Sequence, residues 1–442
     1  MGTTLQEVPS PLKTDEERVR DFQRKLYRKA KEDKGFRFYV LYDKMRLPYM
    51  LREAYRRCRA NQGAPGVDGV TFDDIEQTVG TAVFLERMRQ QLEAKTYKPS
   101  AVKRVYIPKA NGKLRPLGIP CIRDRVVQMV CKMVIEPIFE ADFEQDSYGF
   151  RPRKSAADAV RKIKANIKEG KTEIYDADLT AYFDTIPHHE LLTLVARRIS
   201  DKNVIHLIKL WLKAPIWEDG KAHGGTGRGT PQGGVASPLL ANIYMNLVDR
   251  AVGRPNGPFQ QSGISIVRYA DDFILMAKKL KPQAIEYLKG MLARMKLTLN
   301  EEKTRLVDAK TESFNFLGFT FENAASKYGR DRKYLRITPS AKALNTVREK
   351  IRDYVRNNGH LDPEKLVVGM NAIVRGWTNY FTIRGVSNPW DSYRKLRFYL
   401  DEKMTRYYRR KSQRRCKLWN RRAFEVLVKR YGLIDPTQIA WR

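Results

Sequence analysis

Residues 264–278 read ISIVRYADDFILMAK, two apolar runs on either side of Tyr269-Ala270-Asp271-Asp272. β-Branched and aliphatic residues favour strands, so the stretch predicts two strands joined by a tight turn that carries adjacent carboxylates. Adjacent carboxylates repel each other and are driven toward protonation unless a cation lies close by. A divalent metal ion is such a cation. A solvated hairpin tip is the alternative, and it is the favoured interpretation of an isolated Asp-Asp pair.

A second acidic strand argues against that alternative. In TEIYDADL at 172–179, side chains alternate between the two faces, so Asp176 and Asp178 share one face. One of them, together with Asp271 and Asp272, supplies three carboxylates, the ligand set expected where two Mg²⁺ ions lie ~4 Å apart for in-line phosphoryl transfer. Hard oxygen ligands favour Mg²⁺, with Mn²⁺ as a substitute, over zinc.

The net charge also indicates the partner. The chain carries 84 Lys and Arg against 50 Asp and Glu, a net charge of +34, which is typical of a protein that binds a phosphate backbone. A solvated surface usually mixes signs to a modest net charge, so a nucleic acid is expected. No apolar run approaches the roughly 18 residues that span a bilayer, so a cytoplasmic protein with no membrane partner is expected.

The cysteine pattern predicts no zinc site. It contains no C-x-x-C pair and no spacing that would complete a zinc tetrahedron with the five histidines. Reduced core thiols are therefore expected at Cys58, Cys121, Cys131 and Cys416.

Two further stretches predict elements near these strands. Residues 101–120 alternate β-prone runs around Asn111-Gly112, a dipeptide typical of hairpin turns, and predict a basic β-hairpin. Residues 121–140 place apolar side chains at helical spacing and predict a core helix that Pro137 interrupts.

The ends of the chain predict helices. The highly charged stretch 15–34 has few apolar residues and predicts a solvated helical extension. After about residue 330 the strand pattern fades into helical segments rich in Arg, Lys, Tyr and Trp. Helices are also expected around 190–213 and 234–250, which makes the middle of the chain mixed α and β.

Nine stretches occur in the order found in one enzyme family. They are NQGAPGVDG at 61–69, IPKANGKLRPLGIP at 107–120, YGFRP at 148–152, DADLTAYFDTI at 176–186, TPQGGVASPLLANIYMN at 230–246, YADD at 269–272, LNEEKT at 299–304, FLGFTF at 316–321 and GWTNYF at 376–381. The chain resembles the reverse transcriptases of group II introns, also called maturases. GWTNYF resembles the signature of their thumb, or maturase, region.

The resemblance implies the fold and its divisions. It implies an α+β right-hand polymerase, whose fingers and palm combine an antiparallel sheet with helices and precede an α-helical thumb/maturase domain. The expected units are an N-terminal helical extension at 1–60, fingers and palm at 61–330, and the thumb/maturase domain at 331–442.

The resemblance also decides between the two candidate aspartates. The family places an aromatic residue five positions after the catalytic Asp, and that residue here is Phe183, so the metal role falls to Asp178 rather than Asp176. The implied catalytic and metal-binding residues are Asp178, Asp271 and Asp272. Phe183 is expected to pack under the incoming sugar and to exclude a 2′-hydroxyl.

Further residues are assigned by the same resemblance. Lys109 and Arg115 flank the hairpin turn and are expected to hold the triphosphate, although without the resemblance they would be taken as surface charges. Gln232 and Gly233 are expected to line the nucleotide pocket, and Lys303 is expected to support the leaving phosphate. Leu317 and Gly318 are expected to grip the primer.

The expected function is RNA-directed DNA synthesis by two-metal phosphoryl transfer, with binding of group II intron RNA to assist splicing and retrohoming. The expected partners are an RNA template, a DNA or RNA primer, deoxynucleoside triphosphates, intron RNA and a DNA target site; the sequence does not decide the oligomeric state. Two alternatives remain open: an RNA-binding splicing cofactor with a vestigial polymerase site, and a host-recruited enzyme of this type in repair or defence.

Many relatives continue into a DNA-binding stretch and an endonuclease with paired cysteines and histidines. This sequence ends at Arg442, 61 residues past Phe381, so we expect no cleavage of the target strand by this chain.

Overall fold

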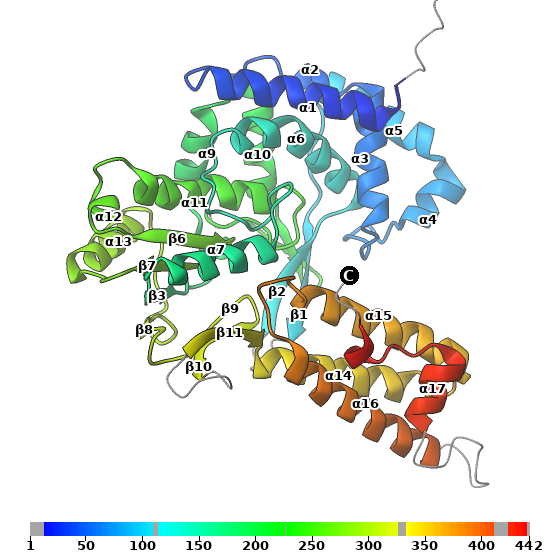
Figure 1. Ribbon diagram of the computed structural model, residues 1–442. Coiled ribbons are helices and arrows are strands. Elements are labelled where there is room, and N and C mark those ends of the chain that lie inside the picture. Colours follow the sequence, from blue (N-terminus) through cyan, green and yellow to red (C-terminus); the bar gives the residue numbers. More distant parts are fainter. Residues whose placement is uncertain (1–12, 109–113, 226, 326–332, 411–422, 440–442) are drawn as a thin grey trace, which may run out of the picture.

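The computed structural model describes residues 13–108, 114–225, 227–325, 333–410 and 423–439. Figure 1 shows helices around small sheets in the first three quarters of the chain and a bundle of helices at its C-terminal end. The expected α+β class with a helical C-terminal region is confirmed.

The central sheet carries the acidic residues. Its strands lie in the order β6-β7-β3-β8, and every neighbouring pair is antiparallel. The alternating side chains of β7 enter two different cores, since Phe273 packs on one face while Ile274 packs on the other. Burial on both faces explains why this segment is continuously apolar. The strands are β6 Ser265–Tyr269, β7 Asp272–Ala277, β3 Glu173–Ala177 and β8 Arg305–Asp308.

The predicted basic hairpin is confirmed. Strand β1 (Val102–Pro108) pairs antiparallel with β2 (Leu114–Ile119), with Pro108 opposite Leu114. The Asn111-Gly112 turn lies outside the described residues. A second short hairpin, β4 (Ile216–Glu218) with β5 (Lys221–His223), extends this sheet through parallel pairing of β4 with β1.

The strands extend further along the chain than expected. Strand β11 (Lys333–Pro339) pairs antiparallel with β10 (Phe319–Ala325), which also pairs with β9 (Phe314–Phe316). The expectation that strands fade after residue 330 was therefore wrong. In β11 the charged residues Lys333 and Arg336 interrupt the apolar alternation, and the pattern is too short to stand out.

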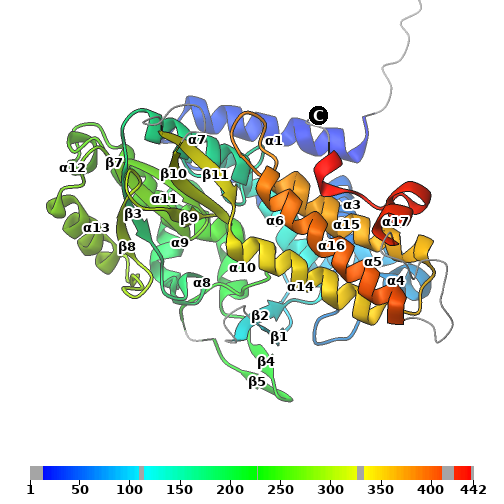
Figure 2. The same cartoon turned by 60° about the horizontal axis from the view of Figure 1, so that its bottom comes forward.

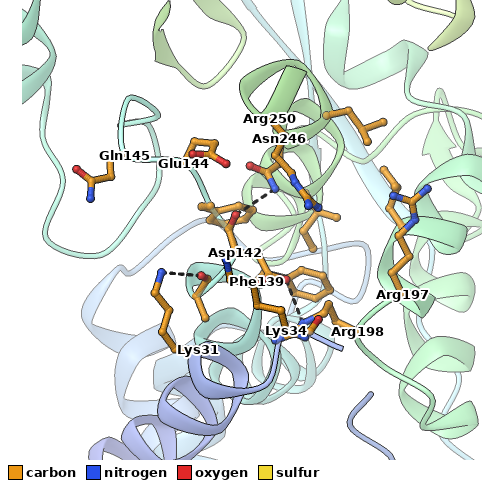
Figure 3. Close-up of a pocket in the computed structure, with 15 residues that line it drawn as sticks. Lys31, Lys34, Phe139, Asp142, Glu144, Gln145, Arg197, Arg198, Asn246 and Arg250 are labelled. Carbon is orange, nitrogen blue, oxygen red and sulfur yellow. Dashed lines mark hydrogen bonds and ion pairs between the residues drawn. The ribbon is translucent and has the colours of Figure 1, made fainter. Parts of the chain in front are cut away.

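The first helix is confirmed, but its description as a solvated extension was wrong. Helix α1 (Asp15–Glu32) packs along α6 (Ile122–Glu140), with Val19 and Ala30 fully buried. Its last turn is held by other elements: Arg198 Nη2 donates to the carbonyl of Ala30 at 2.7 Å. Figure 3 shows this junction, a pocket lined by cationic side chains that include Lys31 of α1, Arg197 and Arg198 just after α9, and Arg250 of α11.

Proline 137 does not end helix α6, contrary to prediction. It lies inside the last turns, where it cannot donate a backbone hydrogen bond to the carbonyl of Met133 four residues earlier. Gln23 of α1 replaces that donor, because its Nε2 lies 2.9 Å from the Met133 oxygen. The contact between two helices thus satisfies a carbonyl that the proline leaves unpaired.

Helices cover the central sheet and make up most of the chain before it. Figures 1 and 2 show α7 along one side of the sheet and α9 and α11 on the other. The helices are α2 Tyr42–Met45, α3 Pro48–Ala60, α4 Phe72–Asp74, η1 Ile75–Val79, α5 Thr81–Glu93, α7 Ala156–Lys168, α8 Tyr182–Thr185, α9 His188–Ala196, α10 Lys202–Leu212, α11 Ser237–Gly253, α12 Pro258–Gln261 and α13 Pro282–Arg294.

The C-terminal bundle has a core of its own. Apolar side chains at helical spacing, such as Val347, Ile351 and Val355, pack against residues from the three other helices. Figure 2 shows the long helices of this bundle lying nearly side by side. The elements are α14 Ala341–Asn357, α15 Pro363–Phe381, α16 Trp390–Arg410, α17 Ala423–Tyr431 and η2 Pro436–Gln438.

Two further expectations concern thiols and membranes. Cys58, Cys121 and Cys131 are buried free thiols, as expected, and Cys416 lies outside the described residues. Within the described ranges, no helix combines the length and the apolar character needed to cross a membrane.

Candidate active site

The acidic turn has the predicted form. Tyr269 pairs with Asp272 across the β6–β7 hairpin, so the loop consists of Ala270 and Asp271 alone. Ala270 adopts φ +61°, the left-handed conformation that tight hairpin turns require. The turn therefore projects Asp271 at its tip and Asp272 at the first position of β7.

The second acidic strand meets this turn. In the β3–β7 pair, Ala177 lies opposite Phe273. Continuing this antiparallel register by one residue sets Asp178 opposite Asp272. The backbone of Asp178 is held from the next segment, because Asn300 N donates to its carbonyl at 2.8 Å. Two stretches almost 100 residues apart in sequence thus converge at one sheet edge.

The carboxylates interact electrostatically. Desolvation of the carboxylate by the surrounding protein raises the pKa of Asp272 to about 6, and repulsion by Asp271, Asp178 and Asp176 adds to this rise. Burial likewise raises the pKa of Asp271, which Arg115 of the β1–β2 hairpin partly offsets. The side chain of Asp272 remains accessible to ligands. The site therefore concentrates negative charge where a cation can reach it.

These side chains fit a hard divalent cation in their chemistry. Carboxylate oxygens are the ligands that Mg²⁺ prefers, and a cation between them would relieve the repulsion that adds to the effect of burial on the pKa of Asp272. In the described ranges, no three His, Cys, Asp or Glu side chains form a preassembled ligand group. Asp178 instead pairs with Lys303, whose Nζ lies 2.7 Å from its Oδ2.

Asp176 lies two residues before Asp178 on the same strand. It pairs across β3–β8 with Arg305, whose Nε lies 3.7 Å from its Oδ2. Burial raises the pKa of Asp176, and Arg305 offsets part of that rise.

Phe183 lies in the short helix α8 that follows β3. Ala181, with φ +46°, turns the chain into this helix, and Thr230 N donates to the Phe183 carbonyl at 2.7 Å. The ring is half-buried and meets the ring of Tyr182 edge-on, with centroids 5.5 Å apart. Phe183 is thus held beside both the aspartate strand and the 230–236 loop.

A polar chain links the hairpin β1–β2 to α8. Arg115 Nε donates to Gln232 Oε1 at 3.1 Å, and Gln232 Nε2 lies 3.3 Å from Oδ2 of Asp184. Gly233 adopts φ +117°, and a Cβ there would lie 2.3 Å from the carbonyl oxygen of Gly118. The close approach of two backbones therefore requires glycine at this position. Lys109 lies outside the described residues.

The expected primer grip contacts the C-terminal bundle. Leu317 and Gly318, with φ +50° and +80°, form the turn between β9 and β10. Tyr380 Oη donates to the Leu317 carbonyl at 3.0 Å, and a Cβ on Gly318 would lie 3.5 Å from the ring of Phe381. A groove of about 800 Å³ opens beside this turn, between α14 and α15, and Lys342 is among its lining residues.

Sequence reasoning missed two polar residues near the site. Asp184 accepts a hydrogen bond from Gln232, and Arg268 is fully buried immediately before the acidic turn. A charged residue inside an apolar strand was a visible signal for Arg268, since such a residue is buried only with partners. No comparable signal pointed to Asp184.

Comparison with family models gives two matches. Residues 107–321 match "Reverse transcriptase (RNA-dependent DNA polymerase)", and residues 344–424 match "Group II intron, maturase-specific domain". The first match contains the acidic turn and the aspartate strand, and the second covers most of the helical bundle.

Relatives extend over most of the chain. Protein YkfC of Escherichia coli (strain K12) is 38% identical over 74% of this chain and 94% of its own length. The group II intron-encoded protein LtrA of Lactococcus lactis subsp. cremoris is 29% identical over 72% of this chain, which spans 63% of LtrA. Among solved structures, a partial Cas6-RT-Cas1–Cas2 complex aligns with a TM-score of 0.36 and 23% identity, over 57% of this chain and 41% of that one.

Proposed function

The chain belongs to the reverse transcriptase family and carries the maturase-specific domain of group II intron proteins, and from that premise we propose that Asp178, Asp271 and Asp272 form its polymerase site. Family membership makes the chain an RNA-directed DNA polymerase. The observation that supports this site is the strand register, which brings Asp178 at the end of β3 beside the turn that carries Asp271 and Asp272.

Reverse transcriptases use divalent metal ions, and we propose two Mg²⁺ ions here, held by the same three aspartates, with Mn²⁺ as a substitute. When bound, such ions would activate the primer 3′-hydroxyl and neutralise charge on the leaving pyrophosphate. The protein contributes the arrangement of its ligands. A turn fixed by strand pairing orients Asp271 and Asp272, while the backbone bond from Asn300 fixes Asp178.

We propose that the deoxynucleoside triphosphate binds between the β1–β2 hairpin and α8. Arg115 presents a planar guanidinium from the hairpin, and Lys303 presents an ammonium beside Asp178. Lys109 belongs to the same proposed set. Phe183, half-buried on α8, would pack against the sugar and leave no room for a 2′-hydroxyl.

RNA is the partner that both matched domains imply. We propose that the fingers and palm at 61–330 hold the RNA template and a DNA or RNA primer, and that the thumb/maturase part at 331–442 also binds folded intron RNA for splicing and insertion at a DNA target. The net charge of +34 supports backbone binding. The groove beside Leu317 and Gly318 supports a primer grip there. A cytosolic location, on the nucleoid when DNA is bound, belongs to this proposal.

The splicing cofactor with a vestigial polymerase site is the weaker alternative. In a protein that no longer polymerises, substitutions of the metal ligands would be tolerated. Here Asp178, Asp271 and Asp272 are all present and converge on one edge of the sheet. No observation here favours a separate role in repair or defence over the intron role.

Primer extension on a poly-purine RNA template with Mg²⁺ tests the polymerase site. Asp271→Asn should abolish extension, because it removes one carboxylate while keeping the side-chain shape. Asp362→Asn is the matched control, since Asp362 is exposed at the start of α15 in the helical bundle. Extension by Asp271→Asn at the wild-type rate would reject the site.

A further inference from the structure

Arg268 is a fully buried charged residue directly before the acidic turn. Its Nε lies 2.8 Å from Oδ1 of Asp249 on α11, which is also fully buried. Its Nη2 donates to Ser147 Oγ at 2.6 Å. Its Nη1 donates both to Asn242 Oδ1 at 2.9 Å and to the Ala270 carbonyl at 2.8 Å. Every guanidinium nitrogen therefore has a partner, and one partner is the backbone of the turn.

Asn242 connects the same guanidinium to a glycine that packs against the turn. Its Oδ1 accepts from Arg268, and its Nδ2 donates to the Gly149 carbonyl at 2.8 Å. Gly149 lies against the turn itself, since a Cβ there would lie 2.3 Å from the backbone nitrogen of Ala270. Arg268, Ala270, Gly149 and Asn242 thus form a closed ring of contacts.

Gly149 is required in this ring for space. Its φ is not in the left-handed region, so an alanine is acceptable to the local backbone. An added methyl group would instead overlap the backbone of Ala270, which cannot give way as a flexible side chain would. Substitution at Gly149 should therefore move the turn rather than strain its own residue.

A purely structural role is the alternative, because buried ion pairs commonly join secondary structures. Such a pair is often replaceable by apolar side chains without loss of stability. Two features argue for more than that here. Arg268 of the pair donates a hydrogen bond to the Ala270 carbonyl within the two-residue loop. Asn242 links the Arg268 guanidinium to Gly149, the glycine that packs on that loop. Both contacts fix the backbone that carries Asp271.

We propose that Asn242, Arg268 and Gly149 are positioning residues, which hold the backbone of the 269–272 turn so that Asp271 and Asp272 face Asp178. They touch neither substrate nor metal, and they act through the turn. This inference rests on the proposed polymerase site. Because displacement of a reacting group by about 1 Å lowers a rate roughly 100-fold, a loosened turn should lower kcat strongly.

The test uses two substitutions with matched controls in the full-length chain. Gly149→Ala is paired with Gly290→Ala, since Gly290 lies in α13 with no atom within 4 Å of an added Cβ. Asn242→Ala is paired with Asn246→Ala one helical turn along α11, where the buried Asn246 contacts the Asp142 carbonyl at 3.5 Å instead. All four are assayed for melting temperature, primer–template affinity, kcat and KM for the nucleotide.

The expected result is selective loss of the chemical step. Gly149→Ala and Asn242→Ala should lower kcat by about 30- to 100-fold, with primer–template affinity within about threefold of wild type. Hydrogen exchange of amides in residues 269–273 should accelerate in both variants without added metal or nucleotide. The two controls should match wild type in kcat and in exchange of this segment.

Three outcomes would overturn the inference: wild-type kcat in both ring variants, equal losses in Asn242→Ala and Asn246→Ala, or unchanged exchange in residues 269–273. A failure of the proposed function is distinguishable, because it would appear as wild-type extension by Asp271→Asn. The hydrogen-exchange measurement requires no catalysis. It therefore shows whether these residues hold the turn even if Asp271→Asn extends primers at the wild-type rate.

Discussion

The ammonium nitrogen of Lys303 lies 2.7 Å from Oδ2 of Asp178, one of the three carboxylates at the sheet edge. The pair joins the β3 end to the 300–304 turn, in which Thr304 N also bonds the Asn300 carbonyl at 2.8 Å. The charge of Lys303 lowers the pKa of Asp272, although by less than the neighbouring carboxylates raise it. A cationic side chain therefore already lies beside the proposed site, and it is exposed.

Lys303→Met should raise KM for the nucleotide. The substitution keeps the length of the side chain and removes the charge that we assign to the triphosphate, so KM should rise about tenfold with a smaller change in kcat. Steady-state primer extension measures both constants. Lys310→Met, at an exposed position after β8, is the control. An unchanged KM in Lys303→Met would remove Lys303 from the nucleotide site.

Polymerase activity should fall as the pH drops below about 6. The pKa of Asp272 is raised to about 6, so the carboxylate is largely ionised at neutral pH and becomes protonated below that value. A protonated carboxyl group is a poor ligand for Mg²⁺, and higher Mg²⁺ concentrations should therefore shift the acid limb to lower pH. Single-turnover extension at several Mg²⁺ concentrations measures this shift. An acid limb independent of Mg²⁺ would contradict the assignment.

Asp272→Asn should stabilise the metal-free protein while abolishing synthesis. The folded-state pKa of about 6 exceeds the ordinary 3.8, so the folded protein binds more protons than the unfolded chain between these values. The associated stability is present at low pH and lost as the pH rises through 6. Asparagine removes the partly desolvated charge and its repulsion by the neighbouring carboxylates. Because the side chain still reaches solvent, we expect Tm to rise by only about 1–3 °C at pH 7.5. Calorimetry at pH 4 and pH 7.5 tests this, since the gain should vanish at pH 4.

The parts predictable from sequence were those encoded within a few residues. The β6–β7 hairpin follows from two apolar runs around a four-residue turn, and the β1–β2 hairpin follows from alternation around Asn111-Gly112. The aspartate strand was recognisable by its period-two spacing. Placing the two acidic segments together required the assumption that their strands are neighbours, and the register of β3 and β7 confirms that they are. The choice of Asp178 over Asp176 came from the family resemblance, because period-two spacing puts both on one face.

The parts not predictable depend on distant partners. Helix α1 has few apolar residues, and it packs on the molecule through the buried Val19 and Ala30. Two bonds to residues more than 100 positions away hold it there, from Arg198 to the Ala30 carbonyl and from Gln23 to the Met133 carbonyl. Gly149 and Asn242 lie 93 residues apart and each resembles an ordinary loop glycine or helix asparagine when taken alone. A single sequence contains no signal that two such distant residues are in contact.

Phe183→Ala should weaken discrimination against ribonucleotides. The ring is half-buried on α8, and its removal opens space where we expect the 2′ position of the sugar. Steric exclusion of this kind is worth roughly 10- to 100-fold in kcat/KM, so incorporation of ribonucleotides should rise by about that factor. Extension with matched deoxy- and ribonucleotides measures the ratio.

Phe398→Ala is the control for this experiment, because Phe398 on α16 is 71% exposed. A loss of all synthesis in Phe183→Ala would leave the ratio unmeasurable, and Phe183→Val, which retains a β-branched wall, then provides the comparison. Unchanged selectivity in an active variant would exclude the gate.

The Gln23 contact predicts a stability effect that a second substitution reverses. Gln23→Ala leaves the Met133 carbonyl buried without a donor, because Pro137 has no N–H to offer, and should destabilise the protein by about 1–3 kcal/mol. Pro137→Ala restores an N–H to the helix, so the double variant should recover most of that loss. Urea unfolding of the four proteins gives the coupling energy. Equal destabilisation by Gln23→Ala with and without the proline would mean that the glutamine stabilises α1 through packing alone.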